Sequence, residues 1–208
     1  MGKRVAIVGG GVSGLIACKY ISDKGFHPIV FESQSEVGGV WTHTTQTTKL
    51  QTPKTSYQFS DFPWPCSVHD TFPHHTQVLD YIQSYTRHYN LLQFIKLNTR
   101  VVSIEFYGAS DDDMASWSLW GCNGEPFSPR GRWVCSVEDT IQHTREVYQV
   151  EFVILCIGIF SDVPNIPYFP PNEGPEVFDG EVIHSIDYSA MEDAKAAEFI
   201  KGKHITVV

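Results

Sequence analysis

The chain carries little positive charge. Its 208 residues include 15 Lys and Arg against 24 Asp and Glu, so the formal net charge is −9 at pH 7. The basic residues are scattered along the sequence and form no block. Because nucleic-acid binding needs Lys and Arg gathered on one face to neutralise phosphates, this composition argues against a nucleic-acid partner.

Long apolar runs and cysteine pairs are also missing. No stretch approaches the roughly 20 apolar residues of a membrane-spanning helix, and no secretory signal precedes the first expected strand. The five cysteines are odd in number and show no C-x-x-C spacing, which is typical of a reduced, intracellular chain. The sequence therefore predicts a cytoplasmic protein without a membrane segment, and its 42% hydrophobic content is enough for a core.

The beginning of the chain contains a strand, a glycine turn, a helix and a second strand. Arg4–Val8 is short, rich in β-branched residues and almost uncharged, as a buried parallel strand is. A Gly-x-Gly-x-x-Gly turn spans residues 9–14, and apolar residues then recur at helical spacing over Val12–Lys24. His27–Phe31 is the second strand, and Glu32 ends it. This order is the pattern of a dinucleotide-binding βαβ unit.

Each residue of this unit has a physical role in dinucleotide binding. Gly9 makes the tight turn, Gly11 leaves room for a pyrophosphate, and Gly14 lets the helix pack closely on the strand. The helix start, including Ser13, offers its free N–H groups to the phosphates. The Glu32 carboxylate can accept hydrogen bonds from ribose hydroxyls. The alternative is a nucleotide-type fold that binds nothing.

The residues after the second strand bear on which dinucleotide binds. Glu32 would repel a 2′-phosphate, and Ser33–Gln34 supplies no arginine to receive one, so NADP is disfavoured at this turn and FAD or NAD is left. The segment Gly39, Val40 and Trp41 brings backbone without a side chain beside a large flat aromatic ring. Such a loop suits the inner part of an extended FAD, and the sequence therefore favours flavin.

The rest of the chain reads as an α/β fold: a Rossmann-like parallel sheet with helices plus an antiparallel β-meander. The expected helices are Gln77–Tyr89, after an N-cap at Thr76, and Glu192–Ile200. The expected strands are a parallel strand Phe94–Leu97, a half-buried strand Arg100–Phe106, the meander strands Trp117–Trp120 and Arg132–Val137, a last strand Val147–Gly158 of this unit, and Lys203–Val208. An acidic turn is expected at Gly108–Asp113. The apolar end of the Val147–Gly158 strand predicts a central parallel position, with Cys156 in the core.

A polar and aromatic segment separates Trp41 from Tyr89. Such a long loop is more often functional than idle. It contains His69, His74 and His75, but no pair of them stands at i, i+4 on an expected helix. We therefore expect loop or helix-start histidines here and no metal site.

Several motifs resemble those of the flavin-containing monooxygenases, above all the N-terminal half of the plant members. The motifs are Gly9-x-Gly11-x-x-Gly14, Glu32, Glu36-x-x-Gly39-x-Trp41, Phe59-Ser60-Asp61-Phe62-Pro63, Cys156-x-Gly158 and Phe178-x-Gly180-x-x-x-His184-x-x-x-Tyr188. The last of these is similar to the signature of the family. Related Baeyer–Villiger enzymes carry Trp at its final position, so Tyr188 favours the heteroatom oxygenases.

The resemblance implies a domain plan. Residues 1–163 would form an FAD-binding domain without its C-terminal return segment, and residues 164–208 a linker with the first elements of an NADPH-binding domain. The family places a second Gly-x-Gly-x-x-Gly turn after a strand like the last one expected here, and the sequence holds no such turn. We therefore expect an N-terminal fragment that is inactive by itself.

The resemblance also implies a reaction: N- or S-oxygenation of a small nucleophilic amine or thioether, using FAD, NADPH and O₂. One alternative is a short module that holds FAD without turnover. Another is an NAD-dependent dehydrogenase, which is disfavoured because Gly38–Trp41 and Phe178–Tyr188 would have no role in it.

Further site residues follow from the same resemblance. Gln51 stands where the wider family often has an Asn beside the flavin edge, and its extra methylene moves the amide by about one bond length. Thr52, Val101 and Gly158 are expected among the cofactor-binding residues. The family signature itself consists of Phe178, Gly180, His184 and Tyr188.

Overall fold

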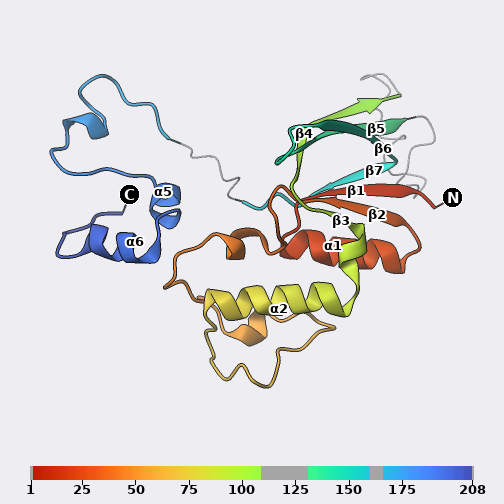
Figure 1. Ribbon diagram of the computed structural model, residues 1–208, viewed down its shortest axis with the longest axis horizontal. Coiled ribbons are helices and arrows are strands. Elements are labelled where there is room, and N and C mark those ends of the chain that lie inside the picture. The colour runs from red at the N-terminus through yellow and green to blue at the C-terminus, as the bar shows by residue number, and fades with distance from the viewer. Residues whose placement is uncertain (1, 109–130, 160–165, 208) are drawn as a thin grey trace, which may run out of the picture. The chain divides into compact units, whose positions relative to one another are not determined.

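The computed structural model describes residues 2–108, 131–159 and 166–207 (Figure 1). The chain divides into two compact units, each made of two segments. The first unit consists of Met1–Thr42 and Leu79–Gly158, and the second of His43–Val78 and Ile159–Val208. Among the described helices, none is both long enough and apolar enough to cross a membrane.

The first unit contains a four-stranded parallel sheet. Its strands are β1 Arg4–Val8, β2 His27–Phe31, β3 Ile95–Lys96 and β7 Phe152–Leu155, in the order β3-β2-β1-β7 (Figure 1). Helix α1, Val12–Asp23, connects β1 to β2. The first two strands have the bounds expected from the sequence, because short uncharged β-branched segments specify buried parallel strands. β3 is shorter than expected, since the 3₁₀ helix η3, Leu91–Phe94, includes its first residue.

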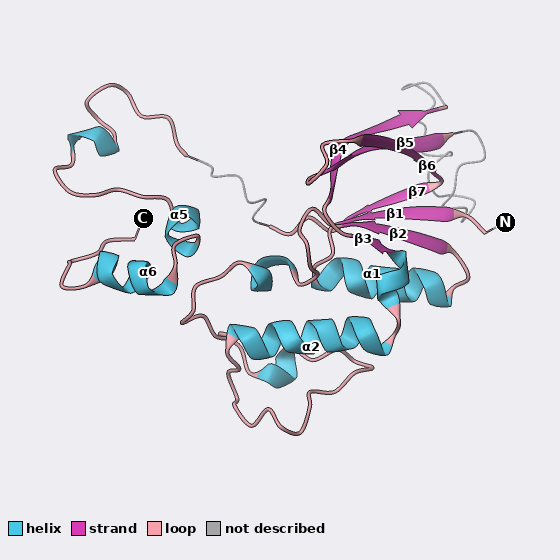
Figure 2. Cartoon of the chain, in the orientation of Figure 1, coloured by secondary structure: helices cyan, strands magenta, loops and turns pink. Residues whose placement is uncertain are grey.

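An antiparallel sheet completes the first unit. It consists of β4 Thr99–Tyr107, β5 Arg132–Asp139 and β6 Arg145–Val150, in that order. Figure 2 shows this sheet on one face of the parallel sheet and α1 on the other. Buried residues of both sheets form a common core: Ala6, Phe31, Cys135, Val137 and Val150. The expected meander strand Arg132–Val137 is confirmed as β5, and β6 is a meander strand that the sequence did not predict, while Trp117–Trp120 and residues 109–113 of the acidic turn lie outside the described residues.

The single strand expected over Val147–Gly158 is in fact two strands. β6 pairs antiparallel with β5, and β7 pairs parallel with β1. The chain changes partners at Glu151, whose N–H donates to the Arg4 carbonyl at 3.0 Å. Among the described strands β7 stands at the edge of its sheet and not at the centre, and Leu155 is 63% exposed. A continuous apolar pattern cannot show where a chain passes from one sheet to another.

Helix α2, His75–His88, starts earlier than the sequence predicted. Thr76 lies inside the helix, and His74 stands at the cap position, because its carbonyl accepts the first helical bond from Val78 at 3.1 Å. The side chain of Gln77 reaches back to the His74 N–H at 2.9 Å, as in a capping box. The buried face of the helix contains Val78, Tyr81, Ile82 and Tyr85. The sequence pattern predicts a buried face of Val78, Leu79, Ile82 and Tyr85, but Tyr81 is buried and Leu79 is only partly buried.

The second unit contains short helices and long connections. The short helices are two 3₁₀ helices, η2 (Lys54–Ser56) and η4 (Pro175–Val177), and two α-helices, α5 (Ser185–Ser189) and α6 (Asp193–Ile200). The last of these confirms the expected helix Glu192–Ile200, with Glu192 at its N-cap. The strand expected over Lys203–Val208 does not form within the described residues: residues 203–207 are exposed and belong to no sheet. Its β-branched pattern is not sufficient, because a parallel strand forms only against a neighbour.

Candidate nucleotide-binding site

Two glycines of the first turn are required by the fold itself. Gly9 has φ +104°, and a Cβ on it would lie 2.4 Å from the carbonyl oxygen of Cys156, just after β7. A Cβ on Gly14 would lie 1.9 Å from the Gly9 carbonyl oxygen. The backbone of α1 therefore approaches the turn more closely than any other residue type allows. These two glycines bring the start of α1 to the carboxyl ends of β1 and β7.

Gly11 is needed for a different reason. Its φ of −77° and ψ of −172° are open to any residue, and a Cβ on it would make only an ordinary 3.5 Å contact with the α-carbon of Gly39. Gly39 has φ +59°, and a Cβ on it would lie 3.1 Å from the α-carbon of Gly11. The two glycines thus face each other with backbone on both sides. We call the backbone surface that these two glycines form, with no side chain on either, the glycine cradle.

The start of α1 adjoins the glycine cradle. Gly11 is its N-cap and provides no side-chain hydrogen bond, and the first turn contains no acidic residue. The first N–H groups of any α-helix have no partner within the helix, and they lie at the positive end of its dipole. Val12 and Ser13 occupy this turn. The cradle therefore combines backbone free of side chains, N–H donors and a favourable field, which together suit a pyrophosphate lying against it.

Glu32 lies against the glycine turn. Its side chain is buried, with 7% of its surface exposed. One carboxylate oxygen, Oε2, accepts the N–H of Gly10 at 2.6 Å, and the other, Oε1, accepts the N–H of Gln34 at 2.8 Å. Oε1 also accepts the Ser33 hydroxyl at 3.4 Å, whereas Oε2 has a second lone pair that can still accept a hydroxyl. The geometry thus places an acid beside the cradle, as the sequence predicted.

A second glycine loop is bonded to the first. The Gly38 N–H donates to the Gly10 carbonyl at 3.2 Å, and Gly38 has φ +146°. This left-handed φ favours glycine at position 38, since the nearest obstacle to a Cβ there is only the flexible end of the Leu79 side chain. The 3₁₀ helix η1, Gly39–Thr42, follows. Sequence reasoning included Gly38 in the loop that favours flavin but did not predict its bond to Gly10, since this bond joins segments that are separate in the chain.

The comparisons with known proteins identify the family. Residues 2–208 match the family model described as flavin-binding monooxygenase-like. The chain belongs to this family.

Relatives of known name are consistent with this assignment. The chain is 41% identical over 208 residues to probable flavin-containing monooxygenase 1 of Arabidopsis thaliana, and the alignment covers 99% of this chain and 38% of that protein. The chain thus spans well under half the length of this curated relative. Among solved structures, Tmm from Pelagibacter sp. strain HTCC7211 superposes with a TM-score of 0.62 at 22% identity, covering 88% of this chain and 42% of that one. S-allyl-L-cysteine S-oxygenase from Allium sativum gives 0.60 at 18% identity, covering 76% and 37%. At these identities the two structures show a shared fold.

The other residues expected from the resemblance to flavin-containing monooxygenases are distributed over both units. In the first unit, Val40 and Trp41 follow Gly39 in η1, and Val101 stands opposite Val137 in the antiparallel sheet. Gly158, with φ +75°, ends this unit after β7. The structure therefore brings together the three motif glycines, Glu32 and Gly39, whereas Gln51, Thr52 and the signature residues belong to the second unit.

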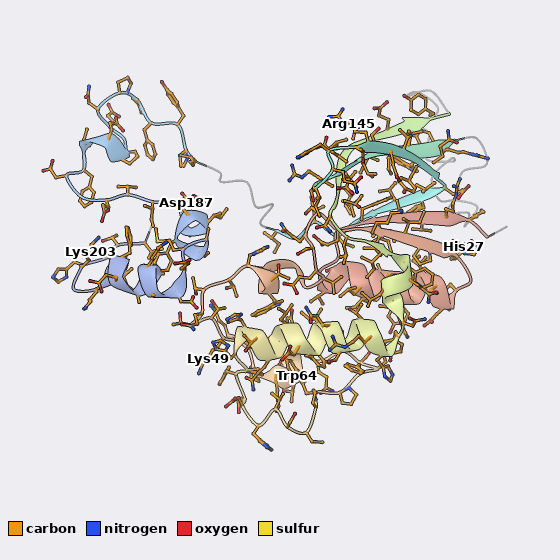
Figure 3. The ribbon with its side chains drawn as sticks, viewed as in Figure 1. His27, Lys49, Trp64, Arg145, Asp187 and Lys203 are labelled. Atoms are coloured by element: carbon orange, nitrogen blue, oxygen red, sulfur yellow. The ribbon has the colours of Figure 1, made fainter. Side chains whose placement is uncertain are left out.

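Gln51 and Thr52 are exposed and lie in a segment with fixed ends. The Leu50 N–H donates to the Pro73 carbonyl at 2.9 Å, and the Lys54 N–H donates to the Thr71 carbonyl at 2.8 Å. The buried indole of Trp64 donates from Nε1 to the Lys54 carbonyl at 2.8 Å (Figure 3). These bonds hold the base of the aromatic loop. They leave the side chains of Gln51 and Thr52 free to meet a ligand.

The family signature builds a short helix. His184 is the N-cap of α5, and its Nδ1 accepts the Ile186 N–H at 3.1 Å. Tyr188, in the same helix, packs on Phe199 of α6 with the ring centroids 6.4 Å apart. Lys203, after α6, binds Glu181 within the signature (Figure 3). In this unit the signature thus has a structural role.

Cys18 and Cys156 are not activated. Burial raises the pKa of the Cys18 thiol to about 12, and burial also raises the pKa of the Cys156 thiol. Because the thiolate is the reactive form, neither group is a nucleophile at neutral pH. Cys156 is only partly buried, after an edge strand, so the expectation that it lies in the core is wrong, while its raised pKa argues against a nucleophile.

Proposed function

We propose that the protein to which this chain belongs is a flavin-dependent monooxygenase and that the glycine cradle holds the pyrophosphate of FAD. The observation that carries this proposal is the pair of facing glycines, Gly11 and Gly39, beside an uncapped helix start in a flavin-binding family. A pyrophosphate needs close backbone approach and N–H donors, and this arrangement provides both.

The remaining residues of the first unit extend the same site. N–H groups of the first helical turn, including Ser13, bind the phosphates, and the Glu32 carboxylate accepts a ribose hydroxyl through the remaining lone pair of Oε2. The carboxylate also repels a 2′-phosphate, which favours FAD over NADP at this turn. By the family resemblance, Val40, Trp41, Val101 and Gly158 line the rest of the cofactor, and Thr52 is a further cofactor-binding residue. Gln51 places an amide donor at the flavin edge.

FAD, when bound, supplies the electron transfer and oxygen activation, with NADPH as the electron source. The chain contributes binding, orientation and exclusion of water. Residues 1–163 are the FAD-binding part, and residues 164–208 are a linker followed by the first elements of an NADPH-binding domain. Because these 208 residues contain no second Gly-x-Gly-x-x-Gly turn, the purified FAD-loaded chain is expected to leave NADPH unconsumed in air.

The substrate class we propose is a small soft nucleophile, an amine or a thioether, in the cytoplasm. Tyr188 at the end of the signature supports a heteroatom oxygenase. S-allyl-L-cysteine S-oxygenase, a protein with the same fold, is by its name an oxygenase of a thioether sulfur.

A graded series at Gly11 tests the FAD site. Gly11→Ala adds a Cβ at ordinary contact distance from Gly39 and should retain part of the flavin, whereas Gly11→Val fills the cradle and should lose it. The measurement is visible flavin absorbance after dialysis of the refolded chain against FAD, with circular dichroism as the folding control. Equal flavin content in wild type and a folded Gly11→Val variant would refute the assignment of the cradle.

A further inference from the structure

Gly10 lies at the centre of a chain of hydrogen bonds that crosses the glycine turn. Its N–H donates to Oε2 of Glu32 at 2.6 Å, and its carbonyl accepts the N–H of Gly38 at 3.2 Å. The end of β2 is thereby linked through Gly10 to the second glycine loop. A Cβ on Gly10 would lie 3.0 to 3.2 Å from Oε2, Cβ and Cγ of Glu32, so the acid side chain also packs flat against this residue.

Both walls of the glycine cradle are direct neighbours of this chain of bonds. Gly11 follows Gly10, and Gly39 follows Gly38. A shift of the Gly10 peptide groups therefore moves Gly11 directly, and it moves Gly39 through the hydrogen bond between Gly10 and Gly38. The separation of the two walls is small, since a Cβ on either glycine would already be in contact with the other. A small displacement is enough to change how a pyrophosphate fits.

The bonding pattern at Glu32 requires a carboxylate. Its two oxygens each accept a different backbone N–H, from Gly10 and from Gln34. A glutamine in the same place has one acceptor and one NH₂ group, so one of the two backbone donors would face another donor. Such buried charge-assisted bonds are stronger than neutral ones. The two backbone N–H groups of Gly10 and Gln34 thus require a glutamate at position 32 even when no ribose is bound.

We propose that Glu32 is a positioning residue: through Gly10 and Gly38 it sets the geometry of the glycine cradle, in addition to any bond with a ribose. This inference rests on the proposed function, because it assigns the cradle to a pyrophosphate. The two roles of Glu32 are separable in experiment. If Glu32 acts through ribose, it should not affect the affinity for a nucleotide that lacks ribose hydroxyls. If Glu32 acts through the cradle, it should affect the affinity for that nucleotide as well.

The test compares ADP with 2′,3′-dideoxy-ADP, whose sugar has no hydroxyls. Calorimetric binding of both nucleotides is measured for wild type, Glu32→Gln and the control Glu36→Gln. Glu36 is an exposed acid of the same connection that bonds Gln83 at 2.9 Å and does not touch Gly10. Loss of a charge-assisted bond in Glu32→Gln should weaken both nucleotides by about tenfold or more, and Glu36→Gln should match wild type. Equal affinity of wild type and Glu32→Gln for the dideoxy nucleotide would overturn the proposal.

Amide hydrogen exchange tests the same proposal without nucleotide. In ¹⁵N-glycine-labelled wild type, the Gly10 and Gly38 amides should be protected, and Glu32→Gln should accelerate exchange at both while Glu36→Gln leaves both unchanged. Unprotected Gly10 in wild type would overturn the proposal even if Glu32→Gln does not fold. If wild type binds neither ADP nor FAD, the proposed function fails, and the exchange result still decides whether Glu32 positions the cradle.

Discussion

Replacing Gly14 by alanine sets two opposing effects against each other at the start of α1. Alanine favours a helix interior over glycine by about 1 kcal/mol. Here, however, the added Cβ would lie 1.9 Å from the Gly9 carbonyl oxygen and 3.0 Å from its carbon. Both are backbone atoms of the tight turn, so no side chain can rotate away to relieve the overlap.

The size of the effect follows from this overlap. The helix start and the turn must separate by about 1.5 Å before the contact becomes an ordinary one of 3.4 Å. Leu15 and Cys18, both fully buried on the same helix, lose contacts as it moves. Overpacking of this kind costs about 1–3 kcal/mol, and the lost contacts add to it. After the gain in helix propensity, we expect a net loss of about 2–3 kcal/mol in the free energy of unfolding and a Tm lower by about 5–10 °C.

The assay is thermal unfolding followed by circular dichroism, with Gly25→Ala as the matched control. Gly25 has φ +80°, and nothing lies within 4 Å of a Cβ added there, so only backbone strain of about 1–2 kcal/mol opposes that change. We expect Gly14→Ala to melt below Gly25→Ala, and both below wild type. If Gly14→Ala melts at or above the wild-type Tm, the close approach of α1 to the turn does not limit residue choice and the reasoning is wrong.

Three further outcomes are expected. Gln51→Ala, in a protein that turns over, should raise hydrogen peroxide release per NADPH oxidised and leave the rate of flavin reduction unchanged; equal peroxide yields would mean that Gln51 is only a loop residue. Cys18, with its pKa raised to about 12 by burial, should resist iodoacetamide in the folded chain while exposed Cys66 reacts, as read by peptide mass spectrometry. Burial and the neighbouring His74 lower the pKa of His75 from 6.5, so the unfolded chain binds this proton more tightly than the folded chain does. The contribution of His75 to stability is therefore present above pH 6.5 and is lost as the pH falls through the lowered pKa. His75→Gln should flatten the fall in Tm below pH 6.5, and an unchanged pH profile of Tm would contradict this.

Local patterns were sufficient for the parts of this protein whose conformation depends on near neighbours. The strands β1 and β2 could be bounded from the sequence, because apolar β-branched segments between glycines and polar residues have few other stable conformations in a sheet. The reasons for Gly9 and Gly14 were also predictable, since a strand, a tight turn and a helix impose the same close approach wherever they occur together. The position of Glu32 followed from that unit.

Element boundaries that depend on a distant partner were not predictable. The apolar segment around Glu151 reads as one strand, and only its pairing with two different sheets divides it. α2 begins at His75 because the Gln77 side chain accepts the His74 N–H and so caps the helix from its first turn. Helix propensity does not decide whether His74 or Thr76 is the N-cap residue. Residues 203–207 have the composition of a strand and form none, since a strand gains its hydrogen bonds from another segment.

The sequence by itself determined that this chain contains a βαβ unit with a glycine turn and a closing acid, because those features are written in residue types at fixed spacing. Only the tertiary structure decided that Gly11 faces Gly39 and that Gly10 joins Glu32 to Gly38. The physical reason is that backbone N–H and carbonyl groups are the same at every position. Which of them meet across loops depends on how the whole unit packs, and residue identity does not encode it.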